Sequence, residues 1–389
     1  MQGEDFRNDL RPVVTPARLA GAGNAAARRL LSAEELAPLT RLNDGRSVLA
    51  MAQTGGLIAL GVLLGLWGLS NWAPWHGLSG QVPEPLRLAD QPGAALLLLL
   101  MALTLLGVAQ HGLFILAHEA AHYRLLSHRG LNDGLGRLIG MVSGISMCTY
   151  RVIHRLHHNH LYGPQDPDTA IHGGYPRGIA YLWKKLAQDL SGWNAWKTCA
   201  YFFGAPAISA DNGPSTRTEH SALNDTSPSL RAAARADRWW VVGLQLLLPL
   251  GCLAAGGWPA LVAYGLLWLL PLLTVLQPIL RLRAICEHGA VDDVGSPLTA
   301  ARSNRCSGSL VNRLGGALLF PHHVNFHLEH HLYPAVPHYH LPRLHQLLQQ
   351  KGVFSGAAEV RELSDTFGRI FAPRRSPSPR PTPRQTAHE

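Results

Sequence analysis

The stretch from residue 239 to residue 280 reads WWVVGLQLLLPLGCLAAGGWPALVAYGLLWLLPLLTVLQPIL and holds no Asp, Glu, Lys or Arg over 42 residues. A membrane-spanning helix needs about 20 predominantly apolar residues, so this stretch is long enough for two spans joined by a tight turn. Two further charge-free stretches, 47–83 and 91–118, can each hold one span. We therefore predict an all-α integral membrane protein with four transmembrane helices, near 48–70, 93–117, 239–257 and 260–280. The second helix is expected to continue past the membrane surface to about Leu126.

The composition of the whole chain agrees with a membrane protein. Of 389 residues only 15% are charged, whereas soluble domains have about a quarter. We predict a polar N-terminal arm over 1–46, with a short helix starting near Ser32, and a membrane domain over 47–350. Residues 351–389 are expected to form a C-terminal helix followed by a disordered tail rich in Pro, Arg and Ser. Disordered, collagen-like and small disulfide-rich classes are excluded.

The net charge of +9 comes from Lys and Arg residues that flank the apolar stretches on one side. Arg41 and Arg46 precede the first span, whereas the connection 73–90 carries only Arg87. The positive-inside rule then places both termini and the long segment 131–236 in the cytoplasm of a multi-pass protein. The positive charges form no single stripe, so no nucleic-acid partner is expected. The five cysteines are odd in number and form no C-x-x-C, which indicates reduced thiols.

Histidine is the residue whose placement carries information about chemistry, because the 21 histidines are concentrated in a few motifs. On a helix, residues three and four apart share a face, so each motif can aim two or three imidazoles at one point. One further histidine directly follows the fourth span. The first histidine motif directly follows the second span, so the two are expected at the same membrane depth. The nine candidate metal ligands are His118, His122, His154, His157, His158, His288, His327, His330 and His331.

The number of these histidines indicates two metal ions. A tetrahedral zinc site uses four ligands at most, whereas eight or nine nitrogens fit two ions with four or five each. Packed imidazolium groups would repel one another, and a metal keeps the rings neutral and oriented. Imidazole suits zinc, copper, iron and nickel, so the ligand type alone leaves the metal open.

The same motifs resemble those of the membrane fatty acid desaturases and hydroxylases, which carry three histidine boxes. The matching residues are HEAAH at 118–122, HRLHH at 154–158 and HLEHH at 327–331, the last within NFHLEHHLYPAVPHYHLPRLH at 325–345. The resemblance covers about residues 47–350. It implies four spans beneath a cytoplasmic helical cap that holds two iron ions on the nine histidines. The implied reaction uses O2 as co-substrate to introduce a double bond into a fatty acyl chain. Fatty acyl hydroxylation or oxidative decarboxylation on the same fold is the alternative.

Two features distinguish this chain from the animal acyl-CoA desaturases in that family. Its first box has three residues between the histidines instead of four, and Ala284 stands where those enzymes place an Asn. An acyl-CoA substrate is therefore not implied, and Asn325 is a weak candidate for a polar role. The sequence holds no Rossmann glycine fingerprint and no iron–sulfur cysteine set. A separate electron donor of ferredoxin, rubredoxin or cytochrome type, with its reductase, is implied.

Several other polar residues are candidates for supporting roles. Carboxylates near the boxes are expected to orient ligand histidines by accepting their second N–H, as metal-bound imidazoles usually require. These carboxylates are Glu119, Asp166, Asp168, Glu287 and Glu329. His160, His322 and His323 are expected to support the ligands in the same way. His111 is expected to be a buried, hydrogen-bonded histidine within the second span. His128, His172, His220 and His388 are expected at the surface.

Two functions from other classes compete with this interpretation. An intramembrane zinc protease would use His118 and His122 as ligands and Glu119 as general base, and would hold one zinc ion. It leaves the other two motifs unexplained. A histidine-rich metal transporter would place paired polar residues within several spans, yet the predicted spans are almost free of them.

Overall fold

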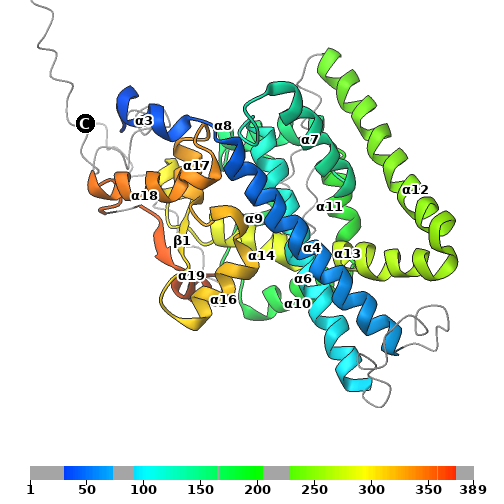
Figure 1. The fold of residues 1–389 in the computed structure, drawn as a ribbon. Helices are drawn as coiled ribbons and strands as arrows, with labels where there is room; N and C mark the ends of the chain where they lie inside the picture. The colour runs from blue at the N-terminus through cyan, green and yellow to red at the C-terminus, as the bar shows by residue number, and fades with distance from the viewer. Residues whose placement is uncertain (1–29, 73–91, 164–165, 205–227, 357, 374–389) are drawn as a thin grey trace, which may run out of the picture.

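The computed structural model describes residues 30–72, 92–163, 166–204, 228–356 and 358–373. The predicted connection 73–90, most of the N-terminal arm, most of the C-terminal tail, His220 and His388 lie outside these residues. The described part is mainly helical (Figure 1). Its first helix, α3 (Ala33–Thr40), starts where the sequence predicted. The Ser32 side chain accepts from the Glu35 backbone N–H at 3.2 Å, and the Glu35 carboxylate accepts from the Ser32 N–H at 2.8 Å.

The first two apolar helices, α4 (Asp44–Trp72) and α6 (Pro92–Ala121), lie side by side along their length (Figure 1). Small residues permit this close approach, since a Cβ at Gly61 would lie 2.7 Å from Cγ of Leu106. The prediction that the second helix continues to about Leu126 is wrong. Helix α6 ends at Ala121, and Tyr123 takes a left-handed backbone with φ of 59°. The chain therefore turns directly after the first histidine motif.

The third apolar segment runs from α12 (Pro228–Tyr264) through a π-helix, η3 (Gly265–Leu269), and α13 (Leu270–Leu273) to α14 (Leu276–His288). Helix α12 is interrupted at Gly256 and Gly257, where φ of Gly257 is 64°. The chain changes direction sharply there (Figure 1), at the turn that the sequence predicted. Among the described residues, three helical runs are long and apolar enough to cross a membrane: Asp44–Asn71, Gly93–Ala121 and Ala232–His288. The division of the third run into two spans stays a prediction.

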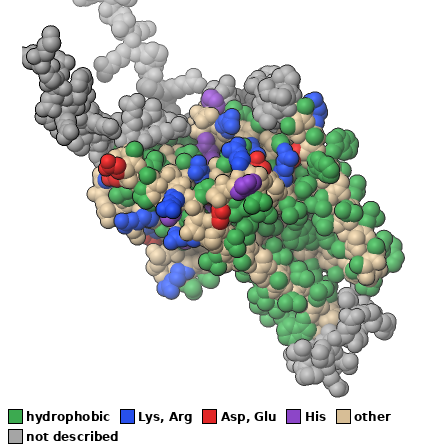
Figure 2. Space-filling view, turned by 45° about the horizontal axis from the view of Figure 1, so that its top comes forward, with side chains coloured by type: hydrophobic (Ala, Val, Ile, Leu, Met, Phe, Trp, Pro, Cys, Tyr) green, Lys and Arg blue, Asp and Glu red, His purple; other side chains and the backbone are tan. Residues whose placement is uncertain are grey.

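Shorter helices between and after these runs form a polar part of the molecule. Figure 2 shows hydrophobic side chains spread over one part of the surface and Lys and Arg gathered on another. The segment between α6 and α12 contains α7 (Arg129–Val142), α8 (Met147–His160), α9 (Thr169–His172), α10 (Ile179–Leu190) and α11 (Ala195–Phe202). The segment after α14 contains α15 (Pro297–Ala300), α16 (Leu310–Leu319), η4 (Pro321–His323), α17 (His327–Leu332), η5 (His338–His340), α18 (Leu341–Gln350) and α19 (Leu363–Ile370).

The all-α prediction misses one small element. Strands β1 (Ser303–Arg305) and β2 (Val360–Glu362) pair in parallel, with Ser303 opposite Val360. The five cysteines are free, as predicted.

Helix α17 is fixed by a hydrophobic cluster on one of its faces. Leu328 and Leu332 are buried against Leu341, Leu344 and Leu348 of α18. Because these two leucines are four residues apart, they share a helix face, and the histidines between them point elsewhere. Apolar packing on one side of α17 thus orients the third histidine motif.

Candidate metal centre

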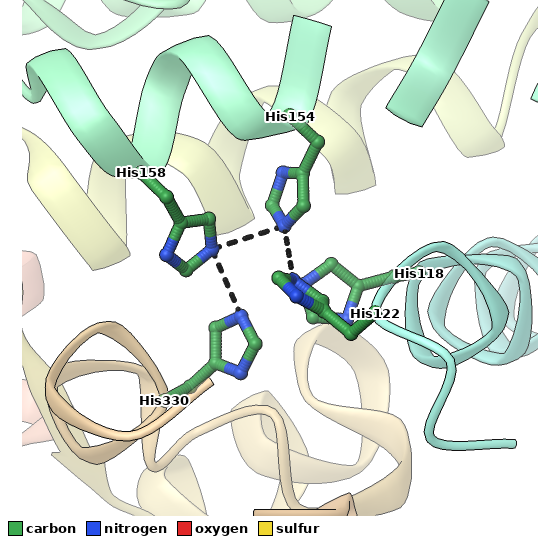
Figure 3. Close-up of side chains that lie close together, drawn as sticks. All are labelled: His118, His122, His154, His158 and His330. Carbon is green, nitrogen blue, oxygen red and sulfur yellow. Dashed lines mark hydrogen bonds between the residues drawn. The ribbon is translucent and has the colours of Figure 1, made fainter. Parts of the chain in front are cut away.

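All nine histidines selected from the sequence meet in the fold, and they form two clusters. The first cluster contains His118, His122, His154, His158 and His330, and the second contains His157, His288, His327 and His331. Within each cluster, one ring nitrogen from each histidine lies within 4.8 Å of those from the others. Figure 3 shows the five rings of the first cluster pointing toward a common centre from three segments of the chain.

Helix geometry explains why each of the last two motifs divides between the clusters. Successive residues turn by about 100°, so residues i and i+4 are about 40° apart, whereas i+3 lies about 60° to the other side. His154 and His158 of α8 accordingly enter the first cluster, and His157 enters the second. In α17 the sense is reversed, because His327 and His331 enter the second cluster and His330 the first. Helices α8 and α17 therefore hold the two clusters side by side.

The distances between ring nitrogens in the first cluster fit ligands around one ion. The Nε2 atom of His154 lies 2.8 Å from that of His122 and 3.0 Å from that of His158, which lies 3.0 Å from Nε2 of His330. An ion bound at about 2.1 Å separates adjacent nitrogens by about 3 Å. An imidazole nitrogen has a single hydrogen or a single lone pair in the ring plane. Nε2 of His154 and of His158 each have two such neighbours, so hydrogen bonds alone do not satisfy these contacts.

The second cluster has the same geometry around His327. Its Nε2 lies 2.8 Å from Nε2 of His288 and 3.1 Å from that of His331, and Nε2 of His288 lies 3.2 Å from that of His157.

In the first cluster, Nε2 of His118 is buried and has no hydrogen-bond partner among the described residues. A buried nitrogen without a partner costs free energy, and a bound metal ion would satisfy it. The donor sets therefore fit two metal ions.

Burial holds most of these imidazoles in the neutral form that binds metals. Loss of solvation, reinforced by neighbouring imidazoles, lowers the pKa of His154, His158, His330 and His331 well below the ordinary value. His157 is the exception. Burial lowers its pKa, but the carboxylates of Asp166 and other acidic neighbours outweigh burial and raise the pKa to about 9. A metal ion at its Nε2 must therefore displace a proton there.

Three of the nine ligand candidates are oriented through their other ring nitrogen. Nδ1 of His157 lies 3.0 Å from Oδ1 of Asp166, and Nδ1 of His288 lies 3.0 Å from the Ala300 carbonyl oxygen. Nδ1 of His118 lies 3.3 Å from a carboxylate oxygen of Glu119. Each acceptor favours a hydrogen on Nδ1, which leaves the lone pair on Nε2, directed into the cluster.

The other supporting carboxylates differ in their contacts. Glu287 lies 3.6 Å from Nδ1 of His327, beyond hydrogen-bond distance, and accepts from Arg283 at 2.8 Å. Asp168 lies 3.5 Å from Nδ1 of His157. The prediction that Glu329 orients a ligand is wrong, since its carboxylate bonds to Ser303 and His345 instead.

The supporting role expected of three histidines is also not what the structure shows. His160 is exposed at the end of α8. Nε2 of His322 lies 2.8 Å from the Thr54 hydroxyl, and the ring of His323 stacks near His338. His111 is buried as expected, but neither ring nitrogen has a hydrogen-bond partner among the described residues. Asn325 bonds to the Asn304 carbonyl oxygen, a contact within the fold.

One residue near the clusters was missed by the sequence. His172 was expected at the surface together with His128, which is exposed, but His172 is buried, with its ring centroid 4.8 Å from that of His288. Its Nε2 lies 3.9 Å from the Asp166 carboxylate. His172 stands alone between Ile171 and Gly173, so no spacing pattern links it to the other histidines. Its two ring nitrogens have no hydrogen-bond partner among the described residues.

A cavity of about 210 Å³ lies beside the clusters. Its wall includes His154, His157, His288 and His327, so the cavity borders residues of both clusters. The remaining wall comes from α8, α9, α10, α11 and α14 and the residues that join them.

Comparison with known proteins agrees with these histidine clusters. The sequence model of the fatty acid desaturase family matches residues 94–361, more than half of the chain, and includes all nine histidines. The chain belongs to the fatty acid desaturase family. It is also 26% identical over 262 residues to a protein named dihydrorhizobitoxine desaturase from Bradyrhizobium elkanii. That alignment covers 64% of this chain and 67% of the relative.

Family membership gives the general class of this protein. The part of the chain that the structure describes contains three helical runs apolar enough to cross a membrane, and a desaturase-family chain with such runs is a membrane protein of an oxidoreductase family. The buried histidine clusters suit a metal site.

Proposed function

We propose that this protein is an O2-dependent di-iron oxidoreductase that introduces a double bond into an acyl chain. The observation that carries the proposal is the division of nine histidines into two adjacent clusters of converging Nε2 atoms. His118, His122, His154, His158 and His330 would hold one iron ion, and His157, His288, His327 and His331 the other. Iron suits this role because it changes oxidation state and activates dioxygen, which zinc does not.

The residues of the chain would prepare the site in three ways. Burial keeps most ligand imidazoles neutral, so their lone pairs are available at neutral pH. Asp166, Glu119 and the Ala300 carbonyl hold the rings of His157, His118 and His288 in a fixed orientation. The packed helices around the clusters limit the access of water, which restricts side reactions of an activated oxidant.

Substrate and electrons would reach the site from different directions. The acyl substrate would come from the membrane, and two electrons for each turnover would come from a separate ferredoxin, rubredoxin or cytochrome-type donor with its reductase. We place the clusters and both termini on the cytoplasmic side, because the Lys and Arg residues flank the apolar runs there. This side is where a soluble donor would bind.

The geometry gives less support to a zinc protease. A general base at Glu119 would need to face a bound water, but its carboxylate accepts the His338 backbone N–H at 2.9 Å and contacts His118. The protease would also leave the second cluster without a role. Acyl hydroxylation or oxidative decarboxylation would use the same nine ligands and differ only in how the chain is placed.

A comparison of lipid and volatile products tests the function. Cells would express the wild-type chain or His157→Ala with a compatible donor and reductase, and extracts and headspace would be analysed by gas chromatography and mass spectrometry. A new unsaturated acyl chain in the wild type alone supports desaturation and locates the double bond. A hydroxy acid or a 1-alkene would replace desaturation by the alternative reaction.

The metal content of the purified protein tests the site independently. The proposal predicts about two iron ions per chain, whereas a protease would hold one zinc ion. Full activity of iron-free protein would exclude the di-iron function. Substantial activity of His157→Ala or His330→Ala would show that the ligand assignment is wrong.

A further inference from the structure

One of the nine candidate ligands reaches the surface of the protein. Eight of these histidines are buried, whereas His122, which directly follows α6, is partly exposed. Its Nε2 lies 2.8 Å from that of His154, inside the first cluster. Electron transfer between proteins slows steeply as the distance between the redox centres grows. An external carrier would therefore approach a metal ion in the first cluster most closely at His122.

The next residue, Tyr123, is held beside this ligand by two arginines. Its left-handed backbone, with φ of 59°, is unfavourable for a bulky residue. The guanidinium carbons of Arg129 and Arg151 lie 3.2 Å and 4.4 Å from the centre of its ring. Contacts between a cation and an aromatic ring at these distances are attractive and hold the ring in place. A partly exposed aromatic ring is thereby fixed directly next to a candidate metal ligand.

A second tyrosine with an arginine beside it flanks the same surface. Tyr339 is partly exposed, and the guanidinium carbon of Arg46 lies 5.6 Å from the centre of its ring. The Tyr339 hydroxyl accepts from the backbone N–H of Asn43 at 2.6 Å, and the neighbouring Asp44 accepts from the Ser127 N–H at 2.8 Å. The start of α4 therefore joins the segment that carries the first tyrosine to the second.

This surface carries more positive than negative charge. We call it the His122 face, and it contains His122, Tyr123, Tyr339, Arg46, Arg124, Arg129, Arg151, Asp44 and Asp133. The Asp133 carboxylate pairs with Arg151 at 2.6 Å and lies 3.8 Å from Arg129. Arg46 and Arg124 form no ion pair with any residue that the structure describes. Four arginines against two carboxylates leave two positive charges in excess.

The composition of the His122 face is that of a protein-binding surface. Arginine and tyrosine are enriched at protein–protein interfaces, and a positive surface speeds association with an acidic partner. Arginines at the end of an apolar helix also set membrane topology or contact lipid headgroups. Neither of those roles needs a stacked tyrosine beside a metal-ligand candidate, whereas an electron carrier does need close access to one. The arrangement around His122 therefore favours a redox partner.

We propose that the His122 face binds an acidic, soluble one-electron carrier protein and that electrons enter the first cluster at His122. Carboxylates of the carrier face Arg46 and Arg124, and its redox centre lies over His122 and Tyr123. Each transfer oxidises the carrier by one electron and reduces the metal ion of the first cluster by one electron, and no covalent bond is made or broken. Two such transfers supply the two electrons of a turnover. This inference rests on the proposed function, and it specifies where the partner binds.

Binding and electron uptake by the full-length chain test the proposal in nanodiscs of phosphatidylcholine, a lipid without net charge. The carrier probe is a reduced, acidic ferredoxin of the plant type, and dithionite is the reductant that needs no binding surface. The double variant Arg46→Gln/Arg124→Gln removes two charges from the His122 face. Arg305→Gln/Arg313→Gln is the matched control, because these arginines are exposed in β1 and α16, which do not form this face.

We expect the wild type to bind ferredoxin with an affinity that falls as salt is added. In the variant of the His122 face the dissociation constant should rise at least five-fold, and electron uptake from subsaturating ferredoxin should slow by the same factor. Uptake from dithionite should change less than two-fold. The control variant should resemble the wild type in all three measurements, and an unchanged melting temperature shows that each variant is folded.

Footprinting with phenylglyoxal, which modifies exposed arginines, needs the wild type alone. Ferredoxin should protect Arg46 and Arg129 from modification and leave Arg305 reactive, as read by mass spectrometry of peptides. This measurement decides the position of the binding surface even if a variant does not fold.

Three results would overturn the proposal. These are equal affinity of the wild type and the variant of the His122 face for ferredoxin, an equal loss of affinity in the control variant, and no protection of Arg46 and Arg129. Failure of the proposed function has a different signature. Iron-loaded protein would then bind ferredoxin at the His122 face but take up electrons from neither ferredoxin nor dithionite.

Discussion

Replacing Asp166 with Asn should weaken one metal site and leave the other intact. The Asp166 carboxylate is buried and accepts from Nδ1 of His157 at 3.0 Å, from the backbone N–H of Tyr162 at 2.8 Å and from that of Asp168 at 3.0 Å. It also accepts from the Thr169 hydroxyl at 3.1 Å. An amide keeps one acceptor oxygen and replaces the other by a donor, so it cannot satisfy all four groups.

The magnitude of the effect follows from the role of the carboxylate in the second cluster. Loss of a partner that orients a metal ligand costs 10–100-fold in affinity, or about 1.4–2.7 kcal/mol. Asp166 contacts His157 and no histidine of the first cluster, so only the second ion should bind more weakly. The metal-free protein would be titrated with Co²⁺, and binding would be followed by optical absorption and calorimetry. We expect one of the two binding constants to fall by this factor.

The matched control is Asp237→Asn, which makes the same change at a buried carboxylate away from the clusters. Asp237 accepts from the Ser146 hydroxyl at 2.8 Å and from the Cys148 N–H at 3.0 Å at the start of α8. This variant should lose stability while both ions bind as in the wild type. Wild-type affinity of Asp166→Asn for both ions would refute the reasoning. Equal weakening in the control would show that the effect passes through the fold of α8.

Adjacent histidines of α17 belong to different clusters, so His330→Ala and His331→Ala should weaken the binding of different ions. Each variant should lower the metal content from about two ions toward one ion per chain. Loss of the same ion from both variants would contradict the division of the histidines into two clusters. The melting temperature of metal-free protein should fall as the pH decreases from 7 to 5. Burial lowers the pKa of His172 to about 3, so below about pH 6.5 the unfolded chain takes up a proton that the folded chain does not. Each such histidine then lowers the free energy of unfolding by roughly 1.4 kcal/mol for each unit by which the pH falls. A flat profile would show that these rings are not held neutral. Arg302→Ala should destabilise the fold by about 3 kcal/mol or more, measured by thermal unfolding. The fully buried guanidinium donates to three backbone carbonyl oxygens, which would lose their donor, whereas Glu359 would keep its ion pair with Arg361.

The sequence was sufficient for the features that depend on local spacing and composition. Apolar runs without charge predict helices long enough to cross a membrane, because length and hydropathy alone set that requirement. The i, i+3, i+4 spacing within 154–158 and 327–331 identified residues that meet in the fold, since helix geometry fixes their relative directions. His288 was found because it follows an apolar run at the depth of the first motif.

Tertiary packing determines the features of the site that the local spacing of residues does not encode. Which histidines share a cluster depends on how α8 and α17 face each other, and these helices lie more than 150 residues apart in the chain. His172 and the Ala300 carbonyl enter the site from segments without a motif. Strands β1 and β2 have three residues each, too few for an alternating pattern. The cavity beside the clusters is also invisible in the sequence, because its wall comes from separate helices that become neighbours only when they pack.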